Sequence, residues 1–151
     1  MNSKKQRDKS IDQFLKWSPW IAVVVIAFCK EKTDRTVRHT VLPAAGSVAL
    51  QFAITETLKR VVKERRPLSF KTDSFPSGHT SAGFAGGEML RTELKNSNPL
   101  LSYSGYVLAI TTGIRRVKER KHWLHDIVGG TAIGIISTWL SKKLFNHFIV
   151  E

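Results

Sequence analysis

The sequence contains little cysteine and few acidic residues. Cys29 is the single cysteine among 151 residues, so no disulfide can form within the chain, and cysteine usage points to neither an oxidising nor a reducing compartment. Only 12 Asp and Glu stand against 24 Lys and Arg, which gives a formal net charge of +12. Such a charge favours nucleic acid, an anionic membrane surface or an anionic substrate. The length suits one domain over residues 1–151, and the sequence shows no repeat or linker.

The placement of the basic residues separates these partners. They gather between apolar segments instead of following one polar helix, which is typical of loops between membrane helices and argues against nucleic acid. The mean hydropathy of −0.15 averages these basic loops with the apolar segments. Residues 1–16 form a basic N-terminal segment. A signal peptide is the alternative for this start, but Lys30-Glu31-Lys32 follows the apolar stretch where a small-x-small cleavage site would be needed.

Five apolar segments predict an all-α fold, a polytopic membrane bundle of about five helices. They cover residues 17–29, 37–58, 78–90, 99–114 and 127–140. The first is short for a ~30 Å hydrocarbon layer unless its helix begins near Ile11. We expect Lys142 and Lys143 to break the last segment before a final apolar patch at 144–150. Gly83-x-x-x-Gly87 and Gly130-x-x-x-Gly134 have the spacing with which helices approach closely in lipid.

Arg116, His122 and Asp126 form the pattern R-x5-H-x3-D near the C-terminal end. On a helix, His122 and Asp126 would share a face, so the carboxylate could accept a hydrogen bond from one imidazole nitrogen and leave the other free to attack. The alternative is an ordinary surface pair of small energetic value. His125 points to a different helical face and lies outside the pattern, so we interpret it as a bystander.

Pro76-Ser77-Gly78-His79 opens the third apolar segment. A helix N-terminus offers free N–H groups and a positive dipole end, both of which favour phosphate. Ser77 can cap this helix, and Gly78 lets an anion come near the backbone. His79 would then stand beside the phosphate and could protonate a leaving oxygen. The alternative is a plain Ser cap followed by a solvent histidine.

Three cations complete a candidate phosphate site. Lys59 and Arg66 belong to the pattern K-x6-R-P, and Arg116 opens the C-terminal pattern. Guanidinium groups match phosphate oxygens bidentately, and fixed cations stabilise the charge of a phosphoryl transition state. The alternative is that these are three of 24 basic residues that flank membrane helices.

In this order and with these gaps, the three blocks resemble the type 2 phosphatidic acid phosphatase (PAP2) superfamily. Its relatives include lipid phosphatases, bacterial undecaprenyl-diphosphate phosphatases, glucose-6-phosphatase and the vanadium haloperoxidases. The resemblance implies that His122 is the nucleophile that becomes phosphohistidine, that Asp126 orients it, and that His79 protonates the leaving group. It implies phosphate-binding roles for Lys59, Arg66, Ser77, Gly78 and Arg116, with no metal and no cofactor.

The implied function is an integral membrane, metal-independent phosphatase of a phospholipid or isoprenoid phosphate. Candidate substrates are phosphatidic acid, phosphatidylglycerol phosphate, undecaprenyl diphosphate and lipid A phosphates. The expected location is the bacterial inner membrane, with the site on the extracytoplasmic side. A vanadate-dependent haloperoxidase is one alternative, although those relatives are soluble. A non-enzymatic basic membrane protein with decayed motifs is another.

The chain departs from the family pattern at two places. Arg115 stands where the family usually has Ser before the third-motif arginine, and five apolar segments are visible where six membrane helices are common. If all five segments span, the N-terminus shares the side of the site, and that side carries 16 of the 24 Lys and Arg. The positive-inside rule then favours a cytoplasmic site. If the first segment does not cross, the count is 11 against 13 and the site faces outward.

Overall fold

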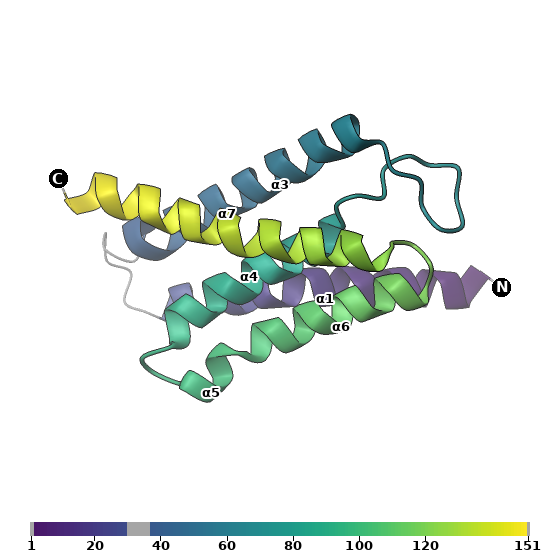
Figure 1. Cartoon of the computed structure of the whole chain (residues 1–151). Coiled ribbons are helices and arrows are strands. Elements are labelled where there is room, and N and C mark those ends of the chain that lie inside the picture. The colour runs from purple at the N-terminus through teal and green to yellow at the C-terminus, as the bar shows by residue number, and fades with distance from the viewer. Residues whose placement is uncertain (1, 30–36, 151) are drawn as a thin grey trace.

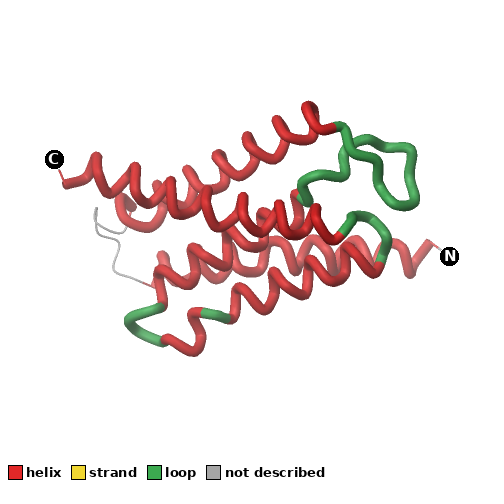
Figure 2. The backbone as a smooth tube through the Cα atoms, viewed as in Figure 1, coloured by secondary structure: helices red, strands yellow, loops and turns green. Residues whose placement is uncertain are grey.

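The computed structural model describes residues 2–29 and 37–150, which form helices joined by loops (Figure 1). The elements are α1 (Asn2–Cys29), the π-helical turn η1 (Val37–Val41), α3 (Leu42–Val62), α4 (Gly78–Leu94), the short α5 (Pro99–Ser102), α6 (Ser104–Lys118) and α7 (Leu124–Val150). Figure 2 shows helix and loop throughout the described ranges. The predicted all-α class with five main helices is therefore confirmed.

The five long helices lie side by side as a bundle, and α4 is at its centre (Figure 1). α4 packs against α1, α3, α6 and α7. Its residues are buried continuously from Thr80 to Leu90. The chain begins at one end of the bundle and finishes at the other (Figure 1). The end where the chain begins is also where α4 and α7 start.

Glycines set the distance between α4 and its neighbours. A Cβ added to Gly105 of α6 would lie 2.7 Å from the Cα of Gly87, so these two backbones touch. On the other side, a Cβ on Gly130 of α7 would lie 2.7 Å from the carbonyl oxygen of Ser77, and one on Gly134 would meet the carbonyl of Ser81. Both glycine pairs predicted from the sequence thus lie at helix interfaces, where they permit close packing.

The bundle buries small polar side chains and exposes apolar ones. In the interior, the Ser47 and Thr138 hydroxyls are 2.7 Å apart, and the Gln51 amide donates to Ser81 over 2.6 Å. Large apolar side chains are exposed on the outer faces, among them Phe52, Val107, Ile110, Ile114, Val128, Ile136 and Trp139. This polarity is typical of helices that associate in lipid. By length and composition, one helical stretch among the described residues could cross a bilayer, His39–Val62, with a mean hydropathy of 1.3.

The basic N-terminal segment 1–16 is helical from Asn2 onward and forms the first half of the continuous helix α1. One boundary prediction was wrong. Lys142 and Lys143 do not break α7, which continues to Val150. Lys142 Nζ donates to Glu93 over 2.9 Å, and Lys143 Nζ lies 5.1 Å from the centroid of the Trp139 ring. Both charges are satisfied while the residues remain helical, and lysine is a good helix former.

Candidate active site

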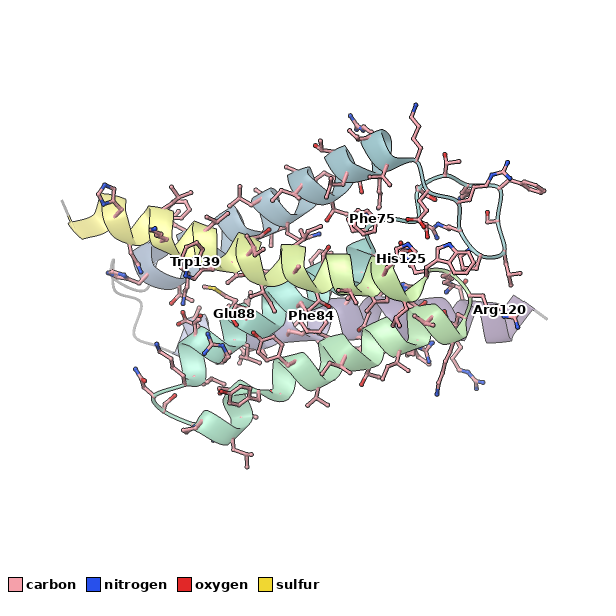
Figure 3. All side chains as sticks on the ribbon, in the orientation of Figure 1. Phe75, Phe84, Glu88, Arg120, His125 and Trp139 are labelled. Atoms are coloured by element: carbon pink, nitrogen blue, oxygen red, sulfur yellow. The ribbon has the colours of Figure 1, made fainter. Side chains whose placement is uncertain are left out.

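The three sequence motifs meet at the end of the bundle where α3 and α6 finish and where α4 and α7 begin (Figure 1). The loops 63–77 and 119–123 close this end. Lys63, in the left-handed conformation with φ 51°, ends α3 by donating its N–H to the carbonyl of Lys59. Figure 3 shows the Phe75 and His125 side chains from two of these elements near one another, with ring centroids 6.2 Å apart.

Asp126 connects the second and the third motif. Its Oδ2 accepts hydrogen bonds from Ser74 Oγ over 2.5 Å and from the Trp123 N–H over 2.8 Å, and it lies 3.2 Å from His122 Nδ1. Its backbone carbonyl accepts from the Ser77 N–H over 3.0 Å. The carboxylate is fully buried. Asp126 therefore positions the His122 ring through its carboxylate and the start of α4 through its backbone carbonyl.

His122 does not lie on the helix that the spacing predicted. α7 begins at Leu124, and Asp126 in its first turn reaches back to the N–H of Trp123, as in one half of a capping box. The His122–Asp126 pair nevertheless forms, because the loop folds over this helix start. An imidazole that donates from Nδ1 to a carboxylate keeps its lone pair on Nε2.

The electrostatics of His122 favour a neutral ring. Burial lowers the pKa of His122 to about 4; the charge of Arg66 acts in the same direction, and Asp126 opposes it. The ring is 4% exposed. At neutral pH, His122 is therefore an uncharged imidazole beside fixed cations, which is the protonation state that a nucleophile requires.

The tetrapeptide 76–79 begins α4 as predicted. Ser77 is the N-cap residue: its Oγ accepts from the Thr80 N–H over 3.4 Å and lies 2.9 Å from Thr80 Oγ1. A Cβ on Gly78 would lie 3.4 Å from Lys59 Nζ, so the lysine ammonium is next to the opening turn of the helix. His79 is close enough to Arg116 and His122 for electrostatic interaction with both. This helix start thus combines the N-terminal end of α4, a cation and an imidazole.

Each of the three predicted phosphate-binding cations contacts a carboxylate. Lys59 Nζ donates to Glu56 over 2.9 Å. Arg66 makes a bidentate pair with Asp73, at 2.8 and 3.0 Å. Burial raises the pKa of Asp73, but the hydrogen bond and the charge of Arg66 outweigh this effect, so the pKa lies below its usual value. These carboxylates hold the cations in place, and a phosphate that enters must compete with them or share them.

Arg116 has a partner that the sequence analysis missed. Its Nη1 donates to Asp12 of α1 over 2.9 Å, and Asp12 also accepts from Arg115 over 3.3 Å and from Lys121 over 3.0 Å. The Nε of Arg116 is buried and has no hydrogen-bond acceptor within the described ranges. Arg115, at the unusual position, therefore pairs with Asp12 of α1 and also with Glu119 over 2.9 Å, while Arg116 keeps a donor for a further anion. A second arginine beside the third-motif arginine requires a counter-ion, and this was the signal in the sequence that could have pointed to Asp12.

His125 lies on the outer side of the same loop cluster. Its Nε2 is 2.7 Å from Glu64 Oε1 and 3.4 Å from Asp126 Oδ1, and its side chain is 59% exposed. His125 and Glu64 are 61 positions apart, so their contact could not be predicted from the sequence. The sequence showed no metal-ligand cluster, whereas the fold brings these three side chains together.

The sequence matches a known family and a curated relative. A model of the PAP2 superfamily matches residues 40–149, which include all three motifs. A lipid A 1-phosphatase of Porphyromonas gingivalis is 36% identical over 84 residues, which cover 53% of this chain and 19% of that protein. The match therefore spans about a fifth of the length of this relative.

Two solved structures share the fold. The crystal structure of Aquifex aeolicus LpxE aligns with a TM-score of 0.67 at 20% identity, covering 87% of this chain and 83% of that one. A membrane phosphatidylglycerolphosphate phosphatase of the PAP2 type from Bacillus subtilis aligns with a TM-score of 0.51 at 22% identity, covering 97% and 88%. The predicted PAP2-like helical bundle is confirmed by these alignments.

Proposed function

The chain belongs to the PAP2 superfamily, and from this premise we propose that it is an integral membrane phosphatase that hydrolyses lipid phosphates through a phosphohistidine at His122. The observation that carries the proposal is the buried pair of His122 Nδ1 and Asp126 Oδ2 at 3.2 Å, beside Arg66 and Arg116. The pair orients a neutral imidazole, and the cations attract the phosphate. No step of this chemistry requires a metal ion.

The reaction has two steps. In the first, His122 Nε2 attacks phosphorus, the bond from phosphorus to the lipid oxygen breaks, and His79 gives its proton to the departing alkoxide. In the second, His79 takes a proton from water, the hydroxide attacks phosphorus, and the phosphorus–nitrogen bond breaks to release inorganic phosphate. The cations and the α4 N-terminus stabilise the phosphoryl oxygens in both steps. They comprise Lys59, Arg66, Ser77, Gly78 and Arg116.

A lipid substrate is supported by an apolar cavity beside the site. It has a volume of 350 Å³ and lies between α4, α6 and α7. Its lining includes Ile110, Ile114 and Ile127, and Lys118 and Leu124 lie where the helices flank the His122 loop. An acyl chain in this cavity would lie along α6 and α7 and end next to the loop that carries His122. The relative from Porphyromonas gingivalis makes a lipid A phosphate the first substrate to test.

The substrate proposal is tested by release of inorganic phosphate from four lipids in detergent with excess chelator. They are a lipid A 1-phosphate, phosphatidylglycerol phosphate, phosphatidic acid and undecaprenyl diphosphate. We expect turnover of at least one, with the lipid A phosphate preferred, and no dependence on added Mg²⁺. No release from any lipid, or activity only with added Mg²⁺, would contradict the proposal.

We further propose that the site faces the extracytoplasmic side of a bacterial inner membrane. The exposed apolar side chains of α6 and α7 support a membrane location. The distribution of basic residues favours the opposite orientation. Because α1 starts at the site end, the side of the membrane with the site carries 16 Lys and Arg and the other side carries 8. Three of the 16 are the proposed phosphate ligands, and Arg115 and Lys121 are paired with Asp12. Setting these five aside leaves 11 against 8, a much smaller bias.

Cysteine labelling tests this orientation. In a Cys29→Ser background, Ser69→Cys introduces a thiol in the loop at the site end, and Ser97→Cys introduces one in the loop at the opposite end. With the site outside, an impermeant maleimide should label position 69 in intact cells and position 97 only after the cells are opened. The reverse pattern would place the site in the cytoplasm.

A further inference from the structure

Three potential metal ligands meet at the outer edge of the site. Glu64 follows the end of α3, while His125 and Asp126 lie in the first turn of α7. One ligand atom from each lies within 4.8 Å of the other two. The shortest separations are 2.7 Å from His125 Nε2 to Glu64 Oε1 and 3.4 Å from His125 Nε2 to Asp126 Oδ1.

The two carboxylate oxygens of Asp126 have different surroundings. Oδ2 accepts hydrogen bonds from Ser74 Oγ and the Trp123 N–H, and it lies next to His122 Nδ1. Oδ1 is buried and has no hydrogen-bond donor in the part of the chain that the structure describes, and His125 is its nearest ionic neighbour at 3.4 Å. A buried carboxylate oxygen without a donor is costly. A cation between Oδ1 and the two outer ligands would satisfy it.

We propose that Glu64, His125 and Asp126 bind a divalent transition-metal ion, Zn²⁺ in the first place, and that the bound ion inhibits the enzyme. One imidazole and two carboxylates form a ligand set that zinc accepts, whereas Mg²⁺ prefers oxygen alone. Bonds of about 2.0–2.2 Å to a tetrahedral ion separate its ligand atoms by roughly 3.3 Å. The 3.4 Å pair already has this spacing, and the 2.7 Å pair must open by roughly 0.6 Å.

The inhibitory effect rests on the proposed function and follows from the position of the ion. An ion on Oδ1 draws negative charge from the carboxylate whose Oδ2 orients His122. The imidazole then becomes a weaker base and a weaker nucleophile. Glu64 and His125 have no part in the proposed chemistry, and the side chain of His125 is 59% exposed. The site is therefore open to ions from solvent and separate from the residues that hold the phosphate.

The test uses His125→Ala and Glu64→Gln, with His147→Ala on the distant end of α7 as the matched control. Zn²⁺ binding is measured by calorimetry on chelator-stripped protein in detergent, and inhibition by Zn²⁺ is measured with a soluble aryl phosphate. We expect one Zn²⁺ site in the wild type and in His147→Ala. In each of the other variants we expect affinity and inhibition to weaken by at least about tenfold, with metal-free activity and thermal stability unchanged.

Three results would overturn the proposal: no Zn²⁺ site in the wild type, equal Zn²⁺ affinity in all four proteins, or binding lost in both variants while inhibition persists. Calorimetry requires no turnover, so it tests the metal site even if the chain proves to have no phosphatase activity. In that case inhibition by Zn²⁺ is ruled out together with the proposed function, while calorimetry still decides whether Zn²⁺ binds.

Discussion

Arg116 Nη1 donates to Asp12 Oδ2 over 2.9 Å, although the two residues are 104 positions apart. Asp12 is 4% exposed and belongs to α1, which precedes the region matched by the family. The same carboxylate also receives Arg115 and Lys121. The N-terminal helix thus completes the candidate site and compensates for the extra arginine at position 115.

Asp12→Asn should separate phosphate binding from catalysis. Without the carboxylate, Arg116 loses an anion that competes with phosphate. A charge-assisted hydrogen bond contributes about 1.5–3 kcal/mol, so inhibition by inorganic phosphate should strengthen by about tenfold. The value of kcat should fall, because Arg116 is no longer fixed for the transition state. Steady-state kinetics with added phosphate measures both effects.

Glu88→Gln is the control for this substitution, since Glu88 pairs with Arg91 in the second half of α4. It should leave inhibition by phosphate unchanged. Weaker phosphate inhibition in Asp12→Asn than in the wild type would show that Asp12 does not compete with the anion.

The low pKa of His122 should appear in the pH profile. Because burial lowers this pKa to about 4, the ring loses its proton at a pH well below the ~6.5 of a free histidine. The nucleophile limb of kcat/KM should therefore stay level as the pH falls and drop only near pH 4. The profile must be corrected for the second ionisation of the substrate phosphate near pH 6. A corrected limb centred near the free-histidine value would contradict the assignment.

The same shift predicts how stability depends on pH. Below ~6.5 the unfolded chain protonates this histidine while the folded chain does not. His122 therefore reduces the free energy of unfolding as the pH falls from ~6.5 towards the folded pKa, and its contribution is constant below that value.

His79→Ala should depend on the leaving group. General acid catalysis contributes ~10²–10⁴-fold, and a lipid alkoxide requires the proton whereas nitrophenolate does not. The loss should therefore be far greater with a lipid phosphate than with p-nitrophenyl phosphate, provided that formation of the phosphoenzyme limits the rate. Vanadate binding checks that the phosphate site is intact. Equal losses with both substrates would assign His79 a role in binding or structure.

Ile114→Trp should obstruct the apolar cavity between α4, α6 and α7. Loss of contact with two methylene groups corresponds to about 1.6 kcal/mol, so KM for the lipid should rise by about tenfold. The p-nitrophenyl ester has no chain and should be unaffected. Ile136→Trp is a matched control on α7, since Ile136 is as exposed as Ile114 but does not line the cavity. Equal KM values for wild type and Ile114→Trp would remove the acyl chain from this cavity.

The sequence predicted the parts of the site that depend on local order. The cap at Ser77 follows from Ser-Gly before an apolar helix, and the pairing of His122 with Asp126 follows from their spacing. The reason given for that pairing was wrong, because His122 precedes the helix and Asp126 caps it. Two residues four positions apart can reach one another whether the first lies in the helix or in the loop before it. The spacing therefore could not show that His122 precedes α7.

Contacts between distant segments could not be predicted in this way. Asp12 is one of two acidic residues in the basic segment 1–16, and nothing in its sequence neighbourhood indicates Arg116. The approach of Glu64 to His125 depends on how the loop 63–77 folds back over α7, which spacing alone does not encode. The prediction that Lys142 would interrupt α7 failed because its partner, Glu93, lies on another helix.

Trapping the phosphoenzyme tests directly whether His122 is the nucleophile. A lipid or aryl substrate carrying radiolabelled phosphate is mixed with the enzyme and quenched in alkali, in which phosphohistidine survives, and the labelled peptide is identified by mass spectrometry. We expect a phosphoryl group on His122, label removed by mild acid, and no label in His122→Ala. Label on another residue, or turnover in His122→Ala at more than a few per cent of the wild-type rate, would contradict it.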